Sequence, residues 1–92
     1  MKSAYELAMS RLERENPLPK VAEAMRVRLA EVDNEITARI AEKKVFLEGE
    51  MAKSVGDPDA VSDLRRQLML EIARLEELRE TRKEKIRASE KE

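Results

Sequence analysis

Residues 54–61, SVGDPDAV, set the point at which this chain reverses direction. Gly56 has no Cβ and can therefore take the left-handed conformation that ends many helices. Asp57 stands directly before Pro58, the usual order for an N-cap followed by proline in the first helical position. Asp59 then places a negative charge near the positive end of the helix dipole. A turn this short, residues 55–57, predicts an antiparallel pair of helices.

Apolar residues recur every three or four positions on both sides of this turn, which is typical of amphipathic helices. We expect one helix over about residues 19–54 and a second over about 58–89. The expected seams are Met25, Leu29, Val32, Ile36, Ile40, Leu47 and Met51 on the first helix and Val61, Leu64, Leu68, Ile72, Leu75, Leu78 and Ile86 on the second. Both seams contain consecutive four-residue steps, which loosen a left-handed supercoil. The prediction is a long, nearly straight two-helix coiled-coil hairpin.

A shorter helix is expected at the N-terminal end, over about residues 3–15. Ser3 and Glu6 have the spacing of a capping box. One apolar stripe follows, made of Tyr5, Ala8, Met9 and Leu12. Residues 16–19 contain two prolines, which disfavour continuation of this helix, although Pro19 is able to begin the next one. Residues 1–92 therefore predict a single all-α domain.

The composition excludes several classes of function. Charged residues make up 42% of the chain, but the formal net charge is −1, so no strong field attracts nucleic acid or an anionic membrane. Cysteine and histidine are absent, which excludes disulfides, Cys/His zinc sites and histidine relays. There is no Gly-rich phosphate loop, nucleophile motif or membrane-length apolar run. We expect a cytoplasmic protein that is not an enzyme, with no catalytic residue, metal or cofactor.

Residues 79–87 form the most basic part of the chain. Glutamates interleave with these cations, and no aromatic residue is near to stack on a base. The pattern favours a solvated helix face over a nucleic-acid site, and salt-sensitive retention of DNA or RNA would reverse that interpretation.

Gly49 interrupts the longer helix at a cost of about 1 kcal/mol relative to alanine. We expect the neighbouring helix to approach closely at this position. A hinge is the alternative.

The hairpin carries more apolar surface than two helices can bury between them. Folding about residues 55–57 places residues 45–47 level with residues 68–70, and three consecutive apolar residues on a helix cannot all face one partner. Either the N-terminal helix folds back, or two chains join into a four-helix bundle. We favour a homodimer, with the N-terminal stripe closing the other end or crossing onto the partner chain. The expected interface residues are Val45, Phe46, Leu47, Leu68, Met69 and Leu70.

The expected function is that of a structural or adaptor protein, a self-associating hairpin that mediates contacts with an unknown protein partner. The alternative is a regulator that inserts its acidic tip into a large machine such as RNA polymerase. In Gly56, Asp57 and Asp59 the turn resembles the tip of Gre-type transcript-cleavage factors, which place carboxylates beside a catalytic magnesium. Pro58 departs from that family's pattern, and two exposed acids supply fewer oxygen ligands than a hard cation takes. The cap interpretation is therefore favoured.

Residues 2–9, KSAYELAM, together with residues 41–43 and 46–50 of the longer helix, resemble a group of small uncharacterised bacterial helical-hairpin proteins. The resemblance spans most of the chain. It implies a bacterial origin and a helical hairpin, and it implies no activity.

Overall fold

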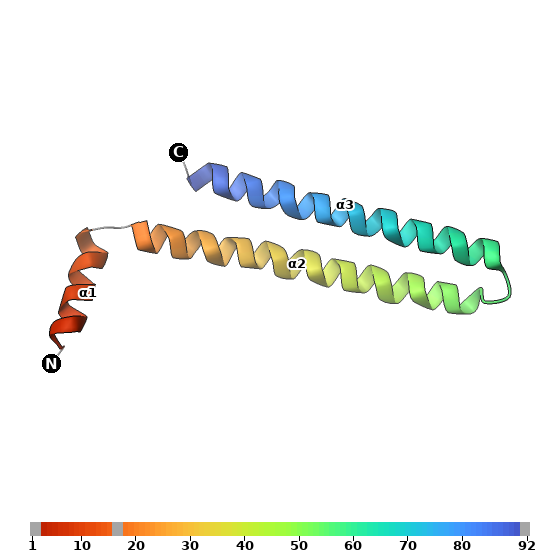
Figure 1. The fold of residues 1–92 in the computed structure, drawn as a ribbon, viewed down its shortest axis with the longest axis horizontal. Coiled ribbons are helices and arrows are strands. Elements are labelled where there is room, and N and C mark those ends of the chain that lie inside the picture. The colour runs from red at the N-terminus through yellow and green to blue at the C-terminus, as the bar shows by residue number, and fades with distance from the viewer. Residues whose placement is uncertain (1–2, 16–17, 91–92) are drawn as a thin grey trace.

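Three helices and no strand make up the described part of the chain. The structure, a computed structural model, describes the backbone of residues 3–15 and 18–90 and the side chains of residues 3–11 and 20–89. The helices are α1 (Ala4–Glu15), α2 (Leu18–Lys53) and α3 (Pro58–Glu90). α2 and α3 run antiparallel and side by side over most of their lengths, while α1 projects from the open end of this pair (Figure 1). The all-α prediction is confirmed, and the long pair has the form of a hairpin.

Two side-chain caps begin the helices where the sequence predicts them. The Ser3 hydroxyl accepts a hydrogen bond from the Glu6 amide at 3.1 Å, which caps α1. The Asp57 carboxylate accepts one from the Ala60 amide at 3.2 Å, and its carbonyl accepts the first helical bond of α3 from Val61. Pro58 is the first residue of α3, and Asp59 lies in its first turn. Each cap satisfies a backbone donor that would otherwise lack a partner.

The end of α2 differs from the expectation for Gly56. No described glycine has a positive φ, so Gly56 does not take the left-handed conformation. The Ser54 amide instead donates to the Met51 carbonyl at 3.1 Å, and the Asp57 amide donates to the Ser54 carbonyl at 2.8 Å. These short-range bonds tighten the last turn and use carbonyls that a left-handed residue would otherwise help to satisfy. The turn lies where the sequence predicts it, but the prediction that a left-handed Gly56 ends α2 is wrong.

The core is a single seam between α2 and α3. Three side chains are almost completely buried there, Val32, Ile36 and Leu47. The flanking members of the seam are half-buried, namely Met25, Leu29, Ile40, Met51, Val61, Leu64, Leu68, Ile72, Leu75 and Ile86. Leu78, expected in the seam, is exposed. Arg79, Arg82 and Lys83 are the half-buried residues at that level instead.

The chain is far more extended than a globular domain of its length. Its radius of gyration is 22.0 Å, whereas a compact 92-residue domain would have one of about 12 Å. The principal extents are 71 × 32 × 11 Å. α1 does not fold back along the hairpin (Figure 1), so it covers neither the open end nor the turn end within one chain. Of its stripe, Tyr5, Ala8 and Met9 are exposed, and Leu12 lies outside the described side chains.

Gly49 is not a point of close helix approach. A Cβ built at this position meets no atom within 4 Å. The prediction that the neighbouring helix requires a glycine here is therefore wrong for the single chain. Gly49 lies two residues after the buried Leu47, about 200° around α2, so it faces away from α3.

Candidate interaction surface

A ring of large apolar side chains surrounds the hairpin near its turn. Four of them are exposed, and we call this set the apolar belt: Val45 (74% exposed), Phe46 (63%), Met69 (67%) and Leu70 (54%). They lie at the level of the chain where the sequence predicts an oligomer interface. A contiguous exposed apolar surface is typical of sites that bind another protein, and Val45 and Phe46 line such a surface on α2.

Two of the six predicted interface residues belong to the hairpin itself. Leu47 is 1% exposed and packs against α3, so no partner can reach it. Leu68 is half-buried in the same seam. The sequence predicts both residues in the interface because each belongs to a run of three consecutive apolar residues, which cannot all face one neighbouring helix. The helix geometry separates them, since consecutive side chains point about 100° apart.

The belt faces in several directions. Phe46 precedes the buried Leu47 on α2, whereas Met69 follows the half-buried Leu68 on α3. Because the two helices are antiparallel, these offsets place Phe46 and Met69 on opposite faces of the hairpin. Val45 and Leu70 point outward from α2 and α3 respectively. Covering the belt therefore requires contacts on more than one side of the molecule.

An open apolar hollow lies on the outer side of α2. Its lining is formed by Ala41, Glu42, Val45 and Phe46, and it is almost entirely apolar in character. Gly49 lies on the same side, one turn further on, and adds no side chain that would narrow the hollow. A second groove between the helices differs in character, because it is lined by charged residues including Arg39, Lys43, Glu71 and Arg74.

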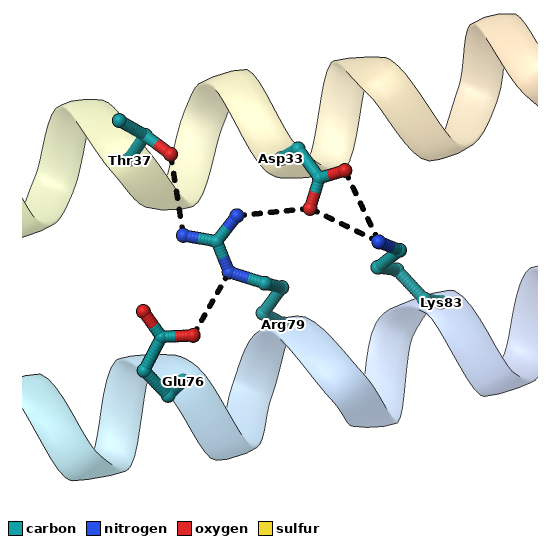
Figure 2. Close-up of polar contacts among 5 residues, drawn as sticks. All are labelled: Asp33, Thr37, Glu76, Arg79 and Lys83. Carbon is teal, nitrogen blue, oxygen red and sulfur yellow. Dashed lines mark hydrogen bonds and ion pairs between the residues drawn. The ribbon is translucent and has the colours of Figure 1, made fainter.

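A cluster of ion pairs joins the helices toward the open end (Figure 2). Arg79 of α3 donates to the Asp33 carboxylate of α2 at 2.9 Å and to the Thr37 hydroxyl at 3.2 Å. Lys83 donates to both Asp33 oxygens, at 3.2 and 3.1 Å. Arg79 Nε lies 3.1 Å from a Glu76 oxygen as an ion pair, but the geometry does not make a hydrogen bond. Nε is thus a buried nitrogen with an ion-pair partner and no hydrogen bond.

A second cluster lies on the other side of the seam. Glu35 accepts from Arg82 of α3 at 2.6 Å and from Arg39, one turn further along α2, at 2.8 Å. Asp33 follows the buried Val32, whereas Glu35 precedes the buried Ile36. The two carboxylates therefore flank the core on opposite faces of the hairpin. Ion pairs thus flank the buried Val32 and Ile36 from both sides of the hairpin.

The ionisation of these groups follows from their partners. Hydrogen bonds from Arg79 and then Lys83 hold the pKa of Asp33 below its ordinary value of 3.8. The hydrogen bond from Arg82 holds the pKa of Glu35 below 4.5. The hydrogen bond to Asp33 raises the pKa of Arg79. All three shifts favour the charged forms, the opposite of what a carboxyl acting as a general acid at neutral pH requires.

The turn residues have structural partners. The Asp57 carboxylate caps α3, as described above. Within the described residues, no three acids, histidines or cysteines lie close enough together to hold a metal ion. The geometry around Gly56, Asp57, Pro58 and Asp59 is that of a helix cap.

None of the described helices has an apolar stretch sufficient to cross a lipid bilayer. No protein-family model, curated protein or solved structure matches the chain. The likeness to small bacterial helical-hairpin proteins therefore stays a prediction.

Sequence reasoning located the belt but missed the ion-pair clusters. The sequence signal for the clusters was present, since apolar residues give way to Arg79 and Arg82 where the seam continues past Leu78. What the pattern alone could not supply was the matching acids. Asp33 and Glu35 stand among many other carboxylates of α2, and only the pairing of the two helices singles them out.

Proposed function

We propose that this protein is a non-enzymatic structural or adaptor protein, a helical hairpin that associates with a second copy of itself and presents charged faces to a protein partner. The observation that carries the proposal is the apolar belt of Val45, Phe46, Met69 and Leu70, which is exposed in the single chain. Burying one exposed Leu or Phe side chain stabilises a complex by roughly 1.5–3 kcal/mol. Four such groups per chain offset much of the entropy lost when two chains associate.

The exposed area supports the same proposal. One chain of 10.6 kDa exposes 7460 Å². A compact monomer of that mass would expose about 5,500 Å², so the surplus is about 2,000 Å² per chain. A stable protein–protein interface buries about 800 Å² on each partner. The surplus is therefore large enough for a dimer interface and for a further contact with a partner.

The charge arrangement supports a protein partner over nucleic acid. Within the basic segment 79–87, three cations are engaged by carboxylates of α2: Arg79 and Lys83 by Asp33, and Arg82 by Glu35. Phosphate recognition depends on cations that have no internal counter-charge. The absence of cysteine fits a reducing compartment, and we place the protein in the cytoplasm.

The proposal is tested by light scattering coupled to size-exclusion chromatography. The test variant is Phe46→Glu combined with Leu70→Glu, which adds two charges to the belt. The matched control is Asn34→Glu combined with Thr81→Glu, which adds the same charge at two exposed positions outside the belt. We expect a dimer for the wild type and the control and a helical monomer for the belt variant. A dimeric belt variant would place the interface elsewhere and overturn the assignment.

A further inference from the structure

Two apolar surfaces are uncovered by any described part of the chain, and they lie toward opposite ends of the molecule. One is the α1 stripe, where Tyr5 is 74% exposed and Met9 is 42% exposed. The other is the hollow on the outer side of α2, lined by Ala41, Glu42, Val45 and Phe46. α1 has 12 residues, and an isolated helix of that length is marginal in water. A surface that receives α1 would therefore stabilise it.

α1 cannot reach the hollow of its own chain. Val45 lies about 40 Å along α2 from Leu18, given a rise of about 1.5 Å per residue. Three peptide steps separate Glu15 from Leu18 and extend at most about 11 Å. Ala8 lies about 10 Å from Glu15 along α1. Even if the connection and α1 both extend fully toward the turn, Ala8 therefore stays at least about 19 Å from Val45.

A second copy in antiparallel orientation removes this difficulty. α2 is about 54 Å long, so Val45 lies about 12 Å from its turn end. If two hairpins overlap fully and point in opposite directions, the turn end of one lies beside the open end of the other. The partner's Val45 then lies about 12 Å from the level of Leu18, well inside the reach of Ala8.

We infer that the hairpin pairs antiparallel with a second copy and that α1 of each chain packs its Tyr5/Met9 stripe into the Ala41/Val45/Phe46 hollow of the other. This inference rests on the proposed self-association and specifies its geometry. A two-fold axis perpendicular to the hairpin makes the exchange reciprocal, so both α1 stripes and both hollows are covered. A parallel dimer would place the hollow of the partner about 40 Å from Leu18 and leave α1 exposed.

The absence of cysteine from the chain makes the inference testable by disulfide trapping. Ala8→Cys and Val45→Cys are made as separate single variants, and each is oxidised alone and as an equal mixture. A disulfide requires the two Cα atoms to lie within about 7 Å. We expect a covalent dimer from the mixture and little from either variant alone. Because each chain carries one cysteine, every disulfide formed is between chains.

In the matched control, the cysteine on α1 is placed at position 10 by Ser10→Cys and position 8 stays alanine. Position 10 lies about 200° around α1 from position 8, so it points away from the hollow when the stripe is docked. We expect the mixture of Ser10→Cys with Val45→Cys to give about tenfold less covalent dimer, since a disulfide depends steeply on this geometry. Equal trapping at positions 8 and 10 would show that α1 is not docked through its stripe.

The outcomes separate this inference from the proposed function. A monomeric wild type in light scattering overturns both. A dimeric wild type in which Val45→Cys alone is trapped efficiently indicates a parallel pair and overturns the inference only. A dimeric wild type in which neither the mixture nor the single variants are trapped shows that α1 does not cover the hollow, which also overturns the inference and leaves self-association standing.

Discussion

Asp33 of α2 and Arg79 of α3 are 46 positions apart in the chain, and their side chains meet at 2.9 Å. The Arg79 side chain is 16% exposed, and the Asp33 side chain is 38% exposed. Their contact lies beside the buried Val32 on α2 and one residue beyond the exposed Leu78 on α3, where the apolar residues of α3 give way to cations. The pair and the bonds to Lys83 and Thr37 (Figure 2) therefore join α2 to α3 in the open half of the hairpin.

The contribution of this pair is measured by a double-mutant cycle. We expect Asp33→Ala and Arg79→Ala each to lower the Tm by several degrees, because each removes one member of a partly buried cluster of charge-assisted hydrogen bonds. The double variant should be more stable than the sum of the two losses predicts. Glu23 and Arg26 form a control pair on the exposed surface of α2, 3.5 Å apart, and its cycle should show almost no coupling. Additive losses for Asp33 and Arg79 would contradict the finding.

Stability should fall on acidification because of Asp33 and Glu35. The pKa of each carboxyl is lower in the folded chain than its ordinary value of 3.8 or 4.5. A group of this kind stabilises the fold above its unfolded pKa and loses that contribution as the pH falls through its folded pKa. We expect the urea midpoint to be flat above about pH 6 and to fall progressively below about pH 5.

The control for the acid response is the variant Asp33→Asn with Glu35→Gln. Its urea midpoint at neutral pH should be lower than that of the wild type, and its decline below about pH 5 should be shallower. If the wild type and the variant decline with the same slope, other carboxylates cause the loss. High salt should reduce the difference between the two proteins, since both clusters are partly exposed.

The buried seam should be sensitive to cavities at Ile36, which has no exposed surface. We expect Ile36→Ala to lower the free energy of unfolding by about 2–5 kcal/mol, the range for deleting a buried aliphatic side chain. Val55→Ala removes a comparable group at an 83% exposed position in the turn and should change the free energy by less than about 0.5 kcal/mol. Both changes in the free energy of unfolding are to be measured by urea denaturation. A small effect at Ile36 would mean that the hairpin does not pack as described.

The turn is tested at Asp57, whose carboxylate accepts from the Ala60 amide. We expect Asp57→Ala to destabilise the chain by about 1 kcal/mol and Asp57→Asn to be almost neutral, because asparagine also caps helices well. The alternative, an acidic tip that assists a metal, requires the negative charge itself. Loss of biological function in the host with Asp57→Asn, at unchanged stability, would support that alternative and contradict the cap interpretation.

The helices and the turn could be predicted from the sequence because their signals are local. Spacing of the apolar residues gives the seam, and Asp57 before Pro58 gives the start of α3. The contacts of Gly49 and the conformation of Gly56 could not be predicted in the same way. A glycine permits a left-handed backbone conformation but does not require one. The conformation of Gly56 depends on the hydrogen bonds of residues 51–57, which the sequence does not reveal.

The exposed apolar belt was predicted only in part, for a related reason. A run of apolar residues such as 45–47 shows that some side chain must face away from the neighbouring helix, but the run does not show which one. The structure assigns Leu47 to the core and leaves Val45 and Phe46 exposed. The ion pairs of Asp33 and Glu35 depend on the alignment of two segments far apart in the chain, which no local pattern encodes.

Self-association is the central claim, and the mass of the wild-type protein in dilute buffer tests it most directly. Light scattering or sedimentation equilibrium at micromolar concentration should give twice the chain mass of 10.6 kDa, and the urea midpoint should rise with protein concentration. A mass of 10.6 kDa, with a urea midpoint that does not depend on concentration, would contradict it.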